Sequence, residues 1–223
     1  MDRIVDIRCK AVLFDMDGTL VDSTAIVEAG WGMWAARHNL SLEAILSFSH
    51  GRPVSATMKH FLPGGDHTRD LEERAHYEET QFEGILAVPG AVKLVQSLQG
   101  HPWAIVTSAW RKLAEARVTA AGLPLPKVIV PVDEIHNGKP DPEGFLHAAK
   151  QLGVEPEQCL VFEDTRPGIE AGLTAGMKVV GLLTTLSANQ LKHNLLIRDF
   201  HDVTLVSGGD FINVSIHCSA TND

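Results

Sequence analysis

The chain has 223 residues, of which 44% are hydrophobic, and its formal net charge at pH 7 is −9. This length and composition are sufficient for one sizeable hydrophobic core with a smaller second unit. The acidic balance, without any run of basic residues, argues against nucleic acid or an anionic membrane surface as the main partner.

The three cysteines are an odd, sparse set without CxxC spacing, which is not typical of a disulfide framework and fits a reducing compartment. Residues 1–8 are polar and mixed in charge, without an apolar signal region, and no stretch reaches the apolar length of a membrane span. We therefore expect a cytoplasmic protein with no membrane partner, either a monomer or a weak homo-oligomer.

An apolar run at residues 11–14 ends abruptly in two carboxylates, Asp15 and Asp17, followed by Gly18. Such a run indicates a buried parallel strand, and ligands bind at the carboxyl ends of the strands in open α/β sheets. The two carboxylates lie two residues apart and repel each other unless a divalent cation or a shared proton compensates. A solvated turn is the alternative interpretation of the same residues.

The next segment is helical in character. Helices are expected at residues 23–38, 42–48, 56–61 and 71–82, with no strand pattern between them. Ser23 is expected to cap the first of these helices, and Trp31 and Trp34 are expected to form the core of the helical unit.

Strands and helices alternate after this helical block. The expected strands are 103–106, 128–130, 160–162, 179–183 and 203–206, all of parallel type, and the expected helices are 90–99, 112–121, 142–152 and 167–175. Residues 211–216 alternate in polarity and predict an edge hairpin, and residues 218–223 are expected to fray.

This order of elements predicts an α/β fold, a doubly wound parallel sheet with right-handed crossovers. The catalytic core would comprise residues 1–21 and 87–223, and residues 22–86 would form an inserted all-helical cap over the carboxyl edge of the sheet.

Three strands of the predicted sheet end in polar residues. The pairs are Asp15 and Asp17, Thr107 and Ser108, and Glu163 and Asp164. Because the carboxyl ends of parallel strands meet at one edge, these side chains are expected to converge there. Lys139 would add a cation from the tight loop between a strand and the helix at 142–152, and an ordinary solvated surface lysine is the alternative interpretation.

Four motifs in this order carry a resemblance to a known family. The sequences are DMDGTLVDS from Asp15, VTS from Val106, GKPDP from Gly138 and FEDTRPG from Phe162. They resemble the four motifs of the haloacid dehalogenase superfamily, and the resemblance covers nearly the whole chain. Within that superfamily the chain looks most like bacterial sugar-phosphate phosphatases, the group of hexitol-phosphate and 2-deoxyglucose-6-phosphate phosphatases.

The resemblance implies a phosphatase acting on a small phosphorylated substrate. Asp15 would attack phosphorus and form an aspartyl-phosphate, and Asp17 would act as general acid and then general base. Thr107, Ser108 and Lys139 would bind the phosphoryl oxygens and stabilise their charge.

The resemblance also implies Mg²⁺ as cofactor. Its ligands would be Asp15, the carbonyl of Asp17, and Asp164, with Glu163 at a metal-bound water. In the cap, Arg52 would place a guanidinium over the substrate, with His50 beside it as a weaker candidate. Trp110 would either line the mouth of the pocket or serve packing.

Other functions are compatible with the same motifs. A phosphomutase of the β-phosphoglucomutase type shares them, as does a phosphatase for glycerol phosphate or phosphoglycolate. A non-catalytic binding protein on this fold would be expected to lack Asp15 or Asp17, and both are present.

Overall fold

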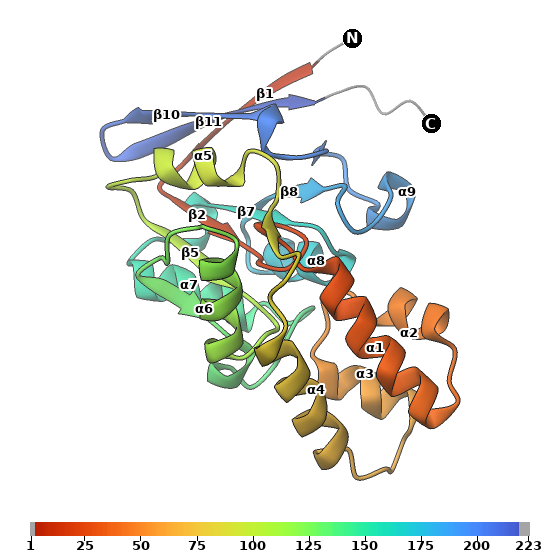
Figure 1. Ribbon diagram of the computed structural model, residues 1–223. Coiled ribbons are helices and arrows are strands. Elements are labelled where there is room, and N and C mark those ends of the chain that lie inside the picture. The colour runs from red at the N-terminus through yellow and green to blue at the C-terminus, as the bar shows by residue number, and fades with distance from the viewer. Residues whose placement is uncertain (1–2, 219–223) are drawn as a thin grey trace.

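A computed structural model of the protein describes residues 3–218 (Figure 1). Its centre is a parallel sheet with the strand order β6-β5-β2-β7-β8-β9. The strands are β2 (Ala11–Phe14), β5 (Trp103–Val106), β6 (Val128–Val130), β7 (Cys159–Glu163), β8 (Lys178–Leu182) and β9 (Leu196–Ile197). All of their pairings are parallel, which confirms the predicted sheet. Strand β2 lies between β5 and β7, so the residues that follow these three strands are neighbours.

Helices cover both faces of this sheet (Figure 1). On one face α7 (Glu143–Leu152) and α8 (Arg166–Thr174) pack against Ala11 and Leu13 of β2. On the other face α5 (Ala91–Ser97) and α6 (Arg111–Ala120) share a core with Val12 and Phe14. Because successive strand residues point to opposite faces, β2 has apolar residues on both sides and is fully buried. The remaining helical segments are short, namely α9 (Ala188–Leu191) and 3₁₀ turns at Val132–Glu134, Pro156–Gln158 and Phe200–Asp202.

A second, antiparallel sheet lies beside the α5 face, with the order β1-β11-β10. This second sheet shows that two of the predictions were wrong. The segment read as a polar N-terminus forms β1 (Arg3–Cys9), and the strand expected to be parallel, β10 (Val203–Gly208), pairs antiparallel with β11 (Phe211–Cys218). The hairpin between β10 and β11 was predicted. The expected fraying at 218–223 concerns Cys218, which ends β11, and residues outside the described range.

The sequence of β1 contains an alternating pattern that its overall composition does not reveal. Ile7 and Cys9 are buried whereas Asp6 and Arg8, which alternate with them, are exposed, and this is the pattern of a half-buried strand. The charged residues made the segment look polar when taken together, although only one face of it is polar.

The helical block lies over the carboxyl edge of the parallel sheet (Figure 1). It contains α1 (Thr24–His38), α2 (Leu42–Ser49), α3 (Val54–Phe61) and α4 (Thr68–Thr80). Trp31 and Trp34 form its core as predicted, with ring centroids 5.5 Å apart. The chain enters and leaves this block, called the cap below, through β3 (Val21–Asp22) and β4 (Leu86–Ala87), which pair antiparallel. The boundaries 22–86 stay a prediction.

Within the described residues, no helix combines the length and the apolar character that crossing a membrane requires.

Candidate active site

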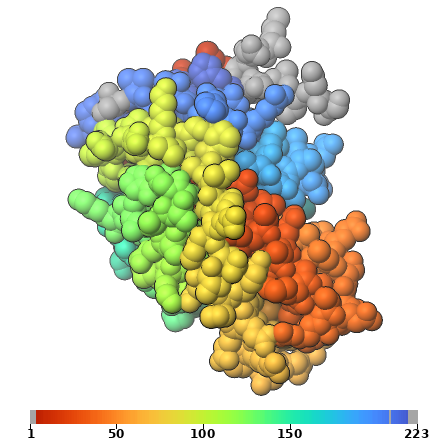
Figure 2. Space-filling view, in the orientation of Figure 1, coloured from red at the N-terminus to blue at the C-terminus, as the bar shows by residue number. Residues whose placement is uncertain are grey.

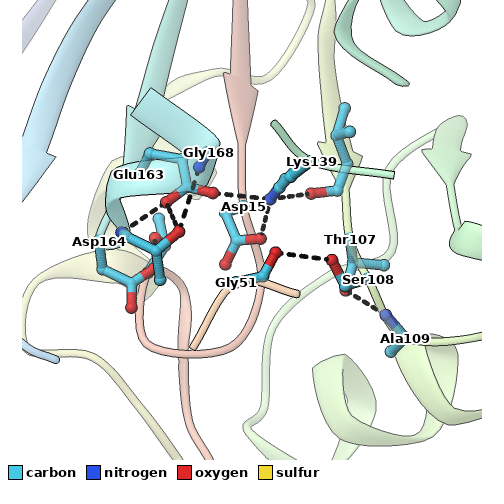
Figure 3. Close-up of polar contacts among 12 residues, drawn as sticks. Asp15, Gly51, Thr107, Ser108, Ala109, Lys139, Glu163, Asp164 and Gly168 are labelled. Atoms are coloured by element: carbon cyan, nitrogen blue, oxygen red, sulfur yellow. Dashed lines mark hydrogen bonds and ion pairs between the residues drawn. The ribbon is translucent and has the colours of Figure 1, made fainter. Parts of the chain in front are cut away.

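Asp15 follows β2 directly and lies at the centre of the site (Figure 3). Its backbone N–H donates to the carbonyl of Phe162 at 3.0 Å, which fixes it beside β7. The chain then turns sharply, with the N–H groups of Leu20 and Val21 both donating to the Met16 carbonyl at 2.9 Å. Gly18 has φ = +86°, and a Cβ there would lie 2.1 Å from Oδ2 of Asp164. Glycine is therefore required at this turn for its conformation and for space.

Lys139 lies behind Asp15 and is only 7% exposed. Its ammonium donates to Asp15 Oδ1, to Glu163 Oε1 at 2.7 Å and to the Val106 carbonyl at 3.2 Å (Figure 3). Burial lowers the pKa of Lys139, but the charges of Asp15 and Glu163 outweigh that effect, so the net pKa is raised. Lys139 is thus a permanent cation beside Asp15.

Glu163 is completely buried, and both of its carboxylate oxygens are engaged. Oε1 accepts from Lys139, and Oε2 accepts from the Thr165 N–H at 2.7 Å and the Thr165 hydroxyl at 2.8 Å. A Cβ on Gly168, in the first turn of α8, would lie 1.6 Å from Oε1. The first turn of α8 therefore has room for this carboxylate only because residue 168 is a glycine. These contacts favour a role for Glu163 in holding Lys139.

Asp164 is 1% exposed, and its two oxygens differ in their contacts. Oδ1 accepts from the Thr19 hydroxyl at 3.0 Å, whereas the buried Oδ2 has no partner in hydrogen-bonding geometry within residues 3–218, although the Thr185 hydroxyl is near enough to lower the pKa of this carboxyl. Burial, with a further contribution from Glu163, raises the pKa of Asp164 to about 7. Burial likewise raises the pKa of Asp15 well above its ordinary value, although Lys139 opposes the shift.

These carboxylates fit a divalent cation. One oxygen each of Asp15, Glu163 and Asp164 lies within 4.8 Å of the others. A buried, unpartnered carboxylate oxygen is costly, and a hard cation such as Mg²⁺ takes oxygen ligands. Since Glu163 is already engaged, Asp15 and the free Oδ2 of Asp164 are the side-chain atoms best placed to hold the ion.

Asp17 does not join this acidic cluster through its side chain. Its Oδ1 accepts from the Ser23 hydroxyl at 2.5 Å and from Arg117 Nη1 at 2.9 Å. Ser23 occupies the N-cap position of α1 as predicted, but its side chain makes no capping hydrogen bond. The hydroxyl orients Asp17 instead.

The end of β5 supplies the polar pair Thr107 and Ser108. The hydroxyl oxygen of Thr107 accepts from the Ala109 N–H at 3.0 Å, and the Ser108 hydroxyl donates to the Gly51 carbonyl of the cap at 3.2 Å (Figure 3). Gly51 has φ = +72°, and a Cβ there would lie 2.3 Å from Oγ1 of Thr165. The cap loop is therefore pressed against the core at this point, on one side of the site.

A cavity of about 200 Å³ lies between cap and core. Most of the predicted site residues line it together, namely Asp15, Asp17, His50, Arg52, Thr107, Ser108 and Asp164. Lys139 and Glu163 do not line it and lie behind Asp15. Trp110 both lines the cavity and donates to Glu79 of α4 at 3.1 Å, so the two interpretations of this residue hold together.

Arg52 and His50, the two substrate-binding residues predicted in the cap, differ in their surroundings. The Arg52 guanidinium lies over the Phe48 ring, 4.7 Å from its centroid. Burial lowers the pKa of His50, which favours its neutral form. A neutral imidazole can donate or accept a hydrogen bond at the cavity wall.

Sequence reasoning missed residues of the cavity wall, above all Arg117 on α6 and Glu78 and Arg74 on α4. A charged residue on the buried face of a predicted helix is the signal that could have found them, because charges are rarely buried unless paired.

The family described as "haloacid dehalogenase-like hydrolase" matches residues 9–176. The chain belongs to this family. The match covers the stretch that contains the sequence motifs and the acidic cluster, and it confirms the resemblance and the expectation of a hydrolase.

Two relatives with curated names and one solved structure are similar to the chain over most of its length. Hexitol phosphatase A of Escherichia coli is 40% identical over 92% of this chain and 99% of that protein. 2-Deoxyglucose-6-phosphate phosphatase 2 of Saccharomyces cerevisiae is 30% identical over 80% of this chain and 82% of that protein. A hydrolase structure from Pseudomonas syringae has a TM-score of 0.78 and 29% identity, covering 85% of this chain and 94% of that one.

Proposed function

We propose that this protein is a Mg²⁺-dependent phosphatase that hydrolyses small sugar or polyol phosphates through an aspartyl-phosphate intermediate. The observation that carries the proposal is the position of Asp15, at a cavity wall with the Lys139 ammonium behind it and the unpartnered Asp164 Oδ2 nearby. The two named relatives, whose names refer to a hexitol phosphate and a deoxyhexose phosphate, support the substrate class.

Catalysis would begin with nucleophilic attack. An Asp15 carboxylate oxygen bonds to phosphorus as the bond from phosphorus to the leaving sugar oxygen breaks. Bound Mg²⁺ would neutralise the repulsion between the carboxylates and the phosphoryl group. Lys139 holds Asp15 in place, and Thr107 and Ser108 lie at the cavity wall to contact phosphoryl oxygens.

Asp17 would transfer the protons. It gives a proton to the leaving alkoxide, then takes one from the water that attacks phosphorus and releases Asp15. Its carboxylate lines the cavity and its side chain is 26% exposed, so it can reach substrate and solvent protons more readily than the buried Asp15.

The test is phosphate release from a panel of hexitol phosphates, hexose phosphates, glycerol phosphate and phosphoglycolate, with Mg²⁺ and with a chelator. We expect the highest kcat/KM for a hexitol or hexose phosphate and loss of turnover on chelation. Preference for glycerol phosphate or phosphoglycolate would refute the substrate class. Turnover that requires a sugar bisphosphate and releases no phosphate would indicate a mutase instead.

A further inference from the structure

Four charged side chains form a continuous chain from the catalytic edge into the cap. They alternate in sign in the order Asp17, Arg117, Glu78 and Arg74. Arg117 Nη1 lies 2.9 Å from Asp17 Oδ1, and Arg117 Nη2 lies 3.1 Å from Glu78 Oε2. Arg74 Nη2 lies 2.6 Å from Glu78 Oε1. The chain joins three elements, because Asp17 follows β2, Arg117 is on α6, and Glu78 and Arg74 are on α4.

The inner members of this chain are removed from water. The Arg117 and Glu78 side chains are 3% and 4% exposed. A buried charge that loses a partner is strongly destabilising. Here the ion pairs leave some buried atoms without a hydrogen-bond partner among the described residues, including Arg117 Nε and Glu78 Oε1, so each remaining contact matters more. Arg117 is planar and uses one terminal nitrogen for each carboxylate, so the positions of Asp17 and Glu78 are linked through a rigid group.

The contacts on Asp17 all fall on one oxygen. Among the described residues, the Ser23 hydroxyl and Arg117 both donate to Oδ1. This arrangement fixes the plane of the carboxylate and leaves Oδ2 as the oxygen that can exchange a proton with a substrate in the cavity.

We propose that Arg117 is a positioning residue for Asp17 and that Glu78 makes this positioning depend on closure of the cap. The inference rests on the proposed role of Asp17 as proton donor. Helix α4 belongs to the cap, whereas α6 packs on the parallel sheet of the core. In the closed arrangement, α4 (yellow) lies beside α6 (green), as Figure 2 shows, and Glu78 reaches Arg117. When the cap opens, Glu78 leaves, and Arg117 no longer has the second partner that fixes it against Asp17.

Because Arg117 would be fixed only while Glu78 contacts it, efficient proton transfer would occur only while the cap is closed. A displacement of about 1 Å in a reacting group can lower a rate by about 10²-fold. A closed cap also keeps bulk water from the site, so the general acid would be in place when water is excluded.

The experiment compares leaving groups. Arg117→Gln, Arg117→Lys and Glu78→Gln are assayed with a hexitol phosphate, whose alkoxide needs a proton, and with p-nitrophenyl phosphate, whose leaving group does not. For Arg117→Gln we expect kcat on the hexitol phosphate to fall about 10- to 100-fold with little change in KM, and kcat on p-nitrophenyl phosphate to fall less than about threefold. Arg117→Lys should recover part of the loss, because the charge remains without the planar fork.

Glu79→Gln is the matched control for the cap. Glu79 is the neighbour of Glu78 on α4 and also bridges to the core, at 2.8 Å from Lys112 Nζ, but it makes no contact with Asp17 in the described structure. We expect Glu78→Gln to lower kcat selectively for the hexitol phosphate, and Glu79→Gln to show no such selectivity. The double variant Glu78→Gln/Arg117→Gln should lose little more than Arg117→Gln alone.

The outcomes separate this inference from the proposed function. Asp17→Asn is assayed in parallel. If Asp17→Asn is selective for the hexitol phosphate and the Arg117 variants are not, the inference is overturned and the function stands. If Asp17→Asn lowers both substrates equally, the role of Asp17 itself is refuted. Thermal unfolding is recorded for each variant, and should Arg117→Gln not fold, the selectivity of Arg117→Lys and Glu78→Gln decides the question.

Discussion

Glu163 Oε1 lies 2.7 Å from Lys139 Nζ, and both side chains are buried behind the nucleophile candidate Asp15. Lys139 therefore contacts two carboxylates, that of Glu163 in β7 and that of Asp15 directly after β2. The arrangement fixes the ammonium so that it can hold Asp15 without moving into the cavity.

Gly168→Ala should disturb this pair without changing a charge. The added Cβ would lie 1.6 Å from Glu163 Oε1, so the carboxylate must move and Lys139 loses its anchor. We expect a loss of stability of about 1–3 kcal/mol, typical of overpacking, and a lower kcat. Chemical denaturation and steady-state kinetics measure both. Gly32→Ala in α1 is the control, since its Cβ meets nothing nearer than Leu42 at 3.8 Å. If Gly168→Ala lowers the stability but leaves kcat unchanged, the position of Glu163 does not affect catalysis.

Asp15→Asn should abolish turnover while the protein remains folded. The amide preserves the shape of the side chain but cannot attack phosphorus. Rapid-quench trapping of labelled phosphoenzyme should detect an acid-stable covalent product in the parent and none in the variant. Retention of near-parental turnover would remove Asp15 from the role of nucleophile.

Mg²⁺ should stabilise the protein more at pH 7.5 than at pH 5.5. The folded pKa of Asp164 is about 7, raised by burial, so the folded protein retains a proton that the unfolded chain releases near its ordinary value of 3.8. Without metal, stability from this group is complete at low pH and is lost as pH rises from about 4 to about 7. Mg²⁺ must displace the proton below that pH. Melting temperatures with and without Mg²⁺ at both pH values measure the effect, and Asp164→Asn should remove it.

Arg52→Ala should lower kcat/KM for sugar phosphates by about tenfold or more while affecting p-nitrophenyl phosphate less. Arg52 lines the cavity from the cap, so it can contact the part of a substrate that the small ester lacks. Arg52→Lys should rescue only in part, because an ammonium has no bidentate fork. Sugar-phosphate kinetics that are identical in Arg52→Ala and the parent would assign this loop to packing.

The sequence by itself determined the central sheet and the placement of the motifs. Apolar runs such as residues 11–14, alternating with helical segments, are typical of strands buried on both faces of a parallel sheet, and the polar residues that end such strands meet at one edge. Asp15, Thr107 and Asp164 could be predicted together for this reason, and the cavity lining confirms that they converge.

Only the tertiary structure decided which groups each charged side chain contacts. Glu163 and Asp164 are adjacent in sequence, yet one is saturated by Lys139 and Thr165 while the other keeps an unpartnered oxygen. Arg117 lies 100 residues from Asp17, and its role depends on how α6 packs against α4. Periodicity reports which face of a helix is buried, but not which distant carboxylate that face meets. Contacts of that kind follow from the packing of whole elements, which no local pattern encodes.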